Sequence, residues 1–83
     1  MNQNEILHKI ISNIIGEKKF QVIEFFVENA DENGFIFATI LDICEKLDVS
    51  KPTVINTIKF LEEKHLLERI KNGLYKINLD LLK

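Results

Sequence analysis

Apolar residues recur at helical spacing near the start of the chain, over residues 4–15. The stripe that they form is wide and made of Ile6, Leu7, Ile10, Ile11, Ile14 and Ile15. This pattern predicts an amphipathic helix, which Gly16 is suited to end. A second helix is predicted over residues 18–29. Most positions from Phe20 to Val27 are apolar, so we expect this helix to be central to the fold.

A turn and a short strand-like segment precede the next pair of predicted helices. Residues 31–34 have turn composition, and residues 35–37 are compatible with a β-strand. Thr39 then opens a third helix with a capping box in which Asp42 takes the place of the usual glutamate. Its apolar positions follow at i, i+3, i+4 and i+7: Ile40, Ile43, Cys44 and Leu47. The sequence therefore predicts a short helix that ends near Leu47.

A serine and a proline mark the start of the fourth predicted helix, over residues 51–64. Ser50 offers an N-cap hydroxyl, and Pro52 falls in the first turn, where a missing N–H costs nothing because it has no helical partner. The buried stripe comprises Val54, Ile58 and Leu61. Ile55 and Phe60 lie outside it. They pack at its edge, meet a second subunit or touch an apolar part of a ligand.

The segment 66–78 predicts a β-hairpin. Two runs of strand-forming residues flank Asn72-Gly73, a dipeptide that favours the tight turn of a two-residue hairpin loop. Alternation along the strands places Arg69 and Lys71 on one face of the first strand. It places Tyr75 on one face of the second strand with Ile77, so we expect Tyr75 to pack rather than to stack on bases. The final DLLK is either a last helical turn or an extended tail.

The order of these elements is helix, helix, short strand, helix, tight turn, helix and hairpin. The stretch TILDICEKLDVSKPTVINTIKFLEEKHLLERIKNGLYKI, which starts at Thr39, resembles the winged helix-turn-helix DNA-binding superfamily over about half of the chain. The resemblance implies an α+β, mostly α fold of three to four helices and a C-terminal β-hairpin wing. The length predicts a single domain over residues 1–83, and the resemblance places the helix-turn-helix at 39–64 and the wing at 66–78.

Shorter stretches resemble narrower groups within this superfamily. The segment LLERIKNGLYKINLDLL is similar to the end of the RepL-type replication proteins of Gram-positive plasmids, which usually have proline where this chain has Leu79. The segment VSKPTVINTI resembles the TubR-type adaptor proteins of plasmid and phage partition, and also regulators of the MarR and ArsR kind. These resemblances imply sequence-specific binding to double-stranded DNA, used in replication, partition or transcription regulation. A replication or partition protein is a further partner to consider.

The fourth helix and the hairpin carry the residue types that such binding needs. An α-helix fits the major groove of B-DNA and reads bases mainly from its N-terminal turns, while its positive dipole end favours phosphate. Asn56 is the best candidate for a base contact, because asparagine pairs with adenine through two hydrogen bonds. The hairpin would lie on the flanking backbone or in the minor groove. The candidate DNA-binding residues are Ser50, Lys51, Thr53, Asn56, Thr57, Lys59, Arg69, Lys71, Asn72 and Lys76.

The N-terminal stripe predicts a homodimer. An 83-residue chain cannot easily hide so much apolar surface, and exposed patches of this kind usually mark interfaces. Two-fold symmetry would also double the phosphate contacts and suit a palindromic or repeated site. The candidate interface residues are Ile6, Leu7, Ile10, Ile11 and Ile14. The alternative is that the stripe completes an internal core against the second helix.

The net charge of −2 says little about a nucleic-acid partner, but the distribution of charged residues along the chain says more. Residues 24–48 contain seven acidic residues against one lysine, whereas residues 51–76 contain six basic residues against three acidic ones. A polyanion would meet the second segment favourably if the fold presents it on one face. An ordinary solvated surface explains the same charges. If the acidic segment is the working surface, the chain is a protein-interaction module on a winged scaffold that does not bind DNA.

Other classes of function find little support in the sequence. His8 and His65 are isolated, Cys44 is the one cysteine, and no phosphate-binding glycine loop or catalytic triad is visible. We therefore expect neither an enzyme nor a cofactor or metal site. No apolar run approaches the roughly 18 residues that a membrane helix needs, and the N-terminus does not resemble a signal peptide. The sequence predicts a cytoplasmic protein.

Overall fold

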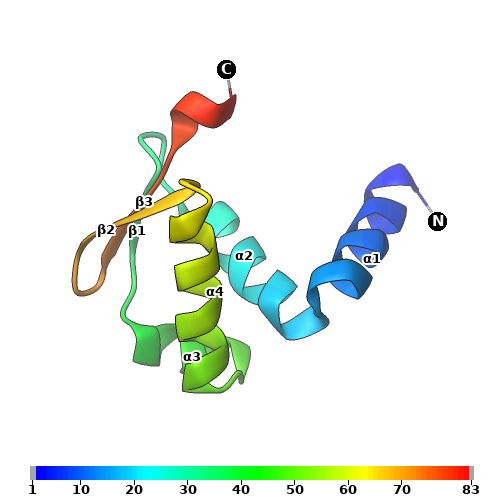
Figure 1. Cartoon of the computed structure of the whole chain (residues 1–83), viewed down its shortest axis with the longest axis horizontal. Coiled ribbons are helices and arrows are strands. Elements are labelled where there is room, and N and C mark those ends of the chain that lie inside the picture. The colour runs from blue at the N-terminus through cyan, green and yellow to red at the C-terminus, as the bar shows by residue number, and fades with distance from the viewer. Residues whose placement is uncertain (1, 83) are drawn as a thin grey trace.

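The computed structural model describes residues 2–82, which form four α-helices, a three-stranded antiparallel sheet and a final 3₁₀ turn (Figure 1). The order is α1 (Gln3–Ile15), α2 (Glu17–Asn29), β1 (Phe35–Phe37), α3 (Ile40–Leu47), α4 (Lys51–Glu63), β2 (Leu67–Lys71), β3 (Leu74–Ile77) and the turn Leu79–Leu82. This is the mostly helical winged helix-turn-helix fold that the sequence predicts. The wing is the β2–β3 hairpin.

One hydrophobic core lies between α2, α3, α4 and the inner face of the sheet. The most deeply buried members come from every one of these elements: Val22, Phe26, Ile36, Ile43, Val54, Ile58 and Tyr75. Phe26 and Tyr75 meet edge to face with ring centroids 5.4 Å apart, which joins the central helix to the wing. The prediction that Tyr75 packs is therefore confirmed.

The sheet has the strand order β1–β3–β2, so the wing is continued by a third strand. The sequence predicts residues 35–37 only as a short segment compatible with a β-strand, and the structure pairs this segment with β3, with Ile36 opposite Tyr75. Gly34 makes this possible. Its φ is +87°, and an added Cβ would lie 2.8 Å from the carbonyl oxygen of Ile77. No other residue fits there without a shift of the backbone.

A β-bulge in β2 corrects one prediction. Arg69 is opposite Tyr75, but Lys71 is opposite Leu74, so one extra residue, Ile70, lies between two regular pairs. Cross-strand partners share a face of the sheet. Arg69 therefore lies on the inner face with Tyr75, and Lys71 lies on the outer face. The prediction that Arg69 and Lys71 share a face is wrong because strict alternation does not hold through the bulge.

Capping residues fix where α3 and α4 begin. Thr39 Oγ1 accepts from the N–H of Asp42 at 3.1 Å, and Asp42 Oδ2 accepts from the N–H of Thr39 at 2.9 Å, as the predicted capping box requires. The backbone hydrogen bond from Thr39, followed by its hydroxyl, lowers the pKa of the Asp42 carboxyl. Ser50 caps α4 by accepting from the N–H of Thr53, and Pro52 lies in the first turn. Both predicted helix starts are confirmed.

Helix α1 projects from the rest of the molecule, at the right of Figure 1. It buries none of its residues. Its contact with α2 includes His8, whose ring meets Phe20 edge to face at 5.3 Å and whose Nδ1 lies 3.9 Å from Glu24 Oε2. Four residues of the predicted stripe are 45% to 76% exposed: Ile6, Leu7, Ile10 and Ile14. The stripe does not complete the internal core, and Ile11 is only half-buried.

Candidate nucleic-acid interface

Helix α4 presents a polar face to solvent. Val54, Ile58 and Leu61 are buried, as predicted. On the opposite face, Asn56 and Lys59 are exposed, and Lys51 is exposed at the N-terminal end. A line of side chains at i, i+4 and i+7 therefore runs from Pro52 through Asn56 to Lys59. This face begins at the positive end of the helix dipole.

The two hydroxyl residues at the start of α4 also serve the helix itself. Ser50 Oγ and Thr53 Oγ1 lie 2.9 Å apart, and Ser50 Oγ accepts from the N–H of Thr53 at 3.4 Å. Ser50 is exposed and Thr53 is half-buried. A hydroxyl has one donor and two acceptor positions, so each retains capacity for a further partner while it supports the cap.

Thr57 is not part of the exposed face, and its predicted contact with DNA is wrong. Its side chain is fully buried, and Thr57 Oγ1 donates to the carbonyl oxygen of Thr53 at 2.7 Å. The helical spacing in the sequence already indicates that Thr57 is buried. Thr57 follows Val54 by three residues and precedes Leu61 by four, so it falls within the buried stripe. A short polar residue enters the core because the preceding turn of the helix satisfies its hydroxyl.

The wing brings two of its four predicted residues to the tip. Lys71 and Asn72 are exposed at the β2–β3 turn, which points toward the same end of the molecule as the start of α4 (Figure 1). Arg69 lies further from the tip, where its Nη2 is 3.5 Å from the hydroxyl of Tyr75. The Tyr75 hydroxyl, with a smaller contribution from Glu62, raises the pKa of the Arg69 guanidinium. Arg69 therefore stays charged.

Lys76 is separated from the exposed face of α4. It is opposite Phe35, on the sheet face turned away from the core, and its Nζ lies 5.4 Å from the centroid of the Phe35 ring. The lysine is half-buried and its ammonium group makes a cation–π contact. The structure therefore does not group Lys76 with the other candidate DNA-binding residues.

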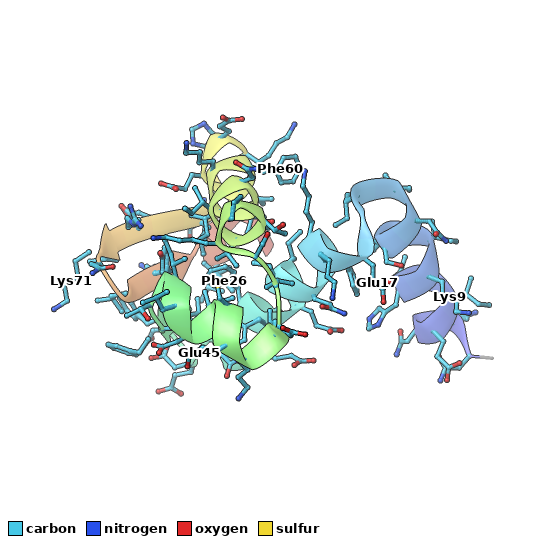
Figure 2. The ribbon with its side chains drawn as sticks, turned by 90° about the horizontal axis from the view of Figure 1, so that it is seen from below. Lys9, Glu17, Phe26, Glu45, Phe60 and Lys71 are labelled. Carbon is cyan, nitrogen blue, oxygen red and sulfur yellow. The ribbon has the colours of Figure 1, made fainter. Side chains whose placement is uncertain are left out.

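Helix α3 of the acidic segment and the exposed side of α4 lie on different sides of the molecule. Figure 2 shows Glu45 of α3 on the side of the molecule opposite to Phe60 of α4, while Lys71 of the wing projects at the far left. Asp42 is exposed on the same helix as Glu45. The exposed face of α4 is thus not faced by the carboxylates of α3.

Within residues 2–82, no three His, Cys, Asp or Glu side chains are grouped so that they could hold a metal ion. A depression of about 960 Å³ lies beside the start of β2 and is lined by residues of mixed charge that include Glu68, Arg69 and Lys76. Cys44 is half-buried and has a free thiol. None of the described helices has the length and apolar character needed to cross a membrane.

The helix pair α3–α4, its capped turn and the adjoining wing define a winged helix-turn-helix protein. The chain belongs to the RepL family of Firmicute plasmid replication proteins, whose model matches residues 3–83. This confirms the resemblance to RepL-type proteins drawn from the sequence.

The relatives with curated descriptions are also described as replication proteins. The chain is 34% identical over 70 residues to a replication and maintenance protein of Bacillus subtilis, covering 83% of this chain and 47% of the relative. The same identity and length hold for a replication and maintenance protein of Staphylococcus aureus, of which 44% is covered. The chain therefore spans less than half the length of these relatives.

A solved structure supports the fold alone. The reduced, iron(II) form of a CO-sensing protein from R. rubrum superposes with a TM-score of 0.69. The match covers 95% of this chain and 40% of that protein at 22% sequence identity.

Proposed function

We propose that this chain binds double-stranded DNA as a homodimer and that it does so in plasmid replication. The observation that carries the proposal is the exposed face of α4, where Asn56 and Lys59 follow the capped N-terminus while the opposite face is buried. Membership of the RepL family favours replication over partition or transcription regulation, the other two roles that the sequence suggests.

The contacts divide by chemistry. Asn56 is in the middle of the exposed face of α4, where it would pair with adenine in the major groove. Lys51 and Lys59 flank it and would neutralise phosphates, as would Lys71 at the wing tip. Asn72 would reach the backbone or the neighbouring minor groove. One hydroxyl proton is used between Ser50 and Thr53, so one of the two hydroxyls would donate to phosphate from the start of the helix. Arg69 is a more distant backbone contact.

The homodimer is supported by the exposed stripe on α1. Its apolar side chains would be covered by a second copy, and their burial is the driving force for association. A two-fold pair would present two copies of α4 to successive half-sites, which suits a repeated or palindromic target. The dimer also compensates for the small number of basic residues on each chain.

Binding to a pool of random duplexes at several salt concentrations tests the proposal. We expect selection of a preferred sequence, and the logarithm of the association constant should fall linearly with that of salt concentration. Each phosphate contacted contributes a slope of about −0.9. Uniformly weak binding to every selected duplex would contradict the proposal.

The roles of α4 and the wing are separated by two alanine variants. Asn56→Ala should cost about 1–3 kcal/mol on the preferred site and relax the preference at one base position. Lys71→Ala should weaken binding to all duplexes alike and reduce the salt slope by about 1 for each chain. Both are exposed, so each variant should keep the wild-type fold. Equal loss of base preference in the two variants would show that the assigned roles are wrong.

A protein-interaction module is a second candidate, favoured by two side chains within the acidic segment. Phe37 is 76% exposed and Leu41 is 62% exposed. Large exposed apolar side chains with acidic neighbours suit a partner of basic and apolar character. In that case the salt experiment above detects no specific duplex, and Phe37→Ala weakens binding to the partner.

A further inference from the structure

Phe60 lies on the flank of α4 that faces α1 and α2, and it lines a groove of about 260 Å³ (Figure 2). The other walls are Ile14 and Ile15 from the end of α1, Ile23 and Lys19 from α2, and the buried Thr57 of α4. Val27 is exposed one helical turn beyond Ile23, so the apolar surface continues along α2. The groove begins where the exposed stripe of α1 ends, at Ile14.

The stripe of α1 is too small to hold a dimer by itself. A helix of 13 residues is about 20 Å long and about 10 Å wide, so one face offers on the order of 200 Å². A stable interface buries about 800 Å² on each partner. A dimer that rests on α1 must therefore extend over neighbouring apolar surface. The adjoining groove provides that surface without a break.

The orientation of the second copy follows from symmetry. In a two-fold dimer, the α1 helices can pair parallel or antiparallel. A parallel pair sets Ile14 against Ile14 of the other copy and leaves the groove beside Phe60 open. An antiparallel pair centred near Ile10 sets Ile6 of one copy against Ile14 of the other. The first turns of each α1 then enter the groove of its partner.

We propose that a second copy of this chain docks in the antiparallel orientation, with its Ile6 and Leu7 in the groove formed by Ile14, Ile23 and Phe60. Continuity of the apolar surface supports this occupant. Ile14 belongs both to the exposed stripe of α1 and to the lining of the groove, so a single partner helix would cover both.

This inference rests on the proposed homodimer and gives Phe60 a role within it. Phe60 belongs to α4, so the partner would brace the helix proposed to enter the major groove. Association of two copies would then fix the orientation of each α4, as well as bring two of them together. Of the three explanations for Phe60 that the sequence allows, the structure favours contact with a second subunit.

Cross-linking between two separately purified variants tests the arrangement. In a Cys44→Ser background, the Ile6→Cys chain is mixed with the Phe60→Cys chain and treated with a bis-maleimide much shorter than α1. We expect the mixed cross-linked dimer in at least tenfold higher yield than from Ile6→Cys mixed with Glu45→Cys. Glu45 is on the opposite side of the molecule from Phe60, so that pair is the matched control.

The outcomes separate this inference from the proposed function when duplex binding and molecular mass are measured on the same samples. Efficient linking of two Ile14→Cys chains, without the mixed Ile6–Phe60 product, would show a parallel pair and overturn the antiparallel docking. A dimer that binds the selected duplex but gives no mixed product would also overturn it, while the proposed function would stand. A chain that is monomeric at all concentrations would contradict both.

Discussion

The Ile10→Asp variant should be a folded monomer that binds a duplex with two half-sites about 100-fold more weakly than the wild-type chain, or more weakly still. Ile10 lies at the centre of the exposed stripe, and a carboxylate there would have to be buried, unpaired, in an apolar interface. Loss of the dimer removes the advantage of engaging both half-sites at once, which is typically 10² to 10⁴. Sedimentation equilibrium gives the mass, and a fluorescence titration gives the affinity.

Lys9→Asp is the control for this variant. It also places an aspartate on α1, at an exposed position that is rotated by about 100° from Ile10 and lies outside the stripe. Because α1 buries no residue, both variants should keep the far-ultraviolet circular dichroism of the wild-type chain. If Ile10→Asp still sediments as a dimer, the contact between copies lies on another surface.

Replacing Tyr75 with alanine should have the largest effect on stability, about 3–5 kcal/mol in the free energy of unfolding. The ring is fully buried between Phe26 of α2 and the wing, and its removal leaves a cavity that the sheet cannot easily close. For a domain of this size such a loss is most of the total stability. Urea unfolding followed by circular dichroism measures it.

Tyr75→Phe distinguishes the ring from its hydroxyl. The hydroxyl meets Arg69, which is exposed, across 3.5 Å, so its removal should cost no more than about 1 kcal/mol. The urea midpoint of Tyr75→Phe should therefore lie close to that of the wild-type chain and far above that of Tyr75→Ala. Similar losses from both would mean that the hydroxyl, rather than the packing of the ring, holds the wing to the core.

Local chemistry made much of this fold predictable. Pro52 marked the first turn of α4, Asn72-Gly73 marked the wing turn, and Thr39 with Asp42 marked the start of α3. Each of these signals acts within four residues, so the sequence alone contains the physical cause. The exposure of Asn56 and Lys59 followed from the same helical spacing, because the stripe opposite them is continuous.

Features that depend on distant segments were not predictable in the same way. The pairing of β1 with β3 depends on Gly34 allowing close approach to Ile77, which lies more than forty residues along the chain. The bulge at Ile70 moves Lys71 to the outer face of the sheet. The composition of the two strands does not predict this bulge. The position of Lys76 above Phe35 follows from that pairing. Thr57 is different, since helical spacing already placed it in the core.

The bulge also affects how copies of this chain can meet. β2 is at one edge of the described sheet, and an edge strand offers unpaired backbone groups to a strand of another chain. Here the extra residue interrupts the ladder, and the charged side chains of Glu68, Arg69 and Lys71 flank it. Both features oppose strand-to-strand aggregation. The proposed self-association would thereby be directed away from the wing, beside α4, and toward the helical side of the molecule.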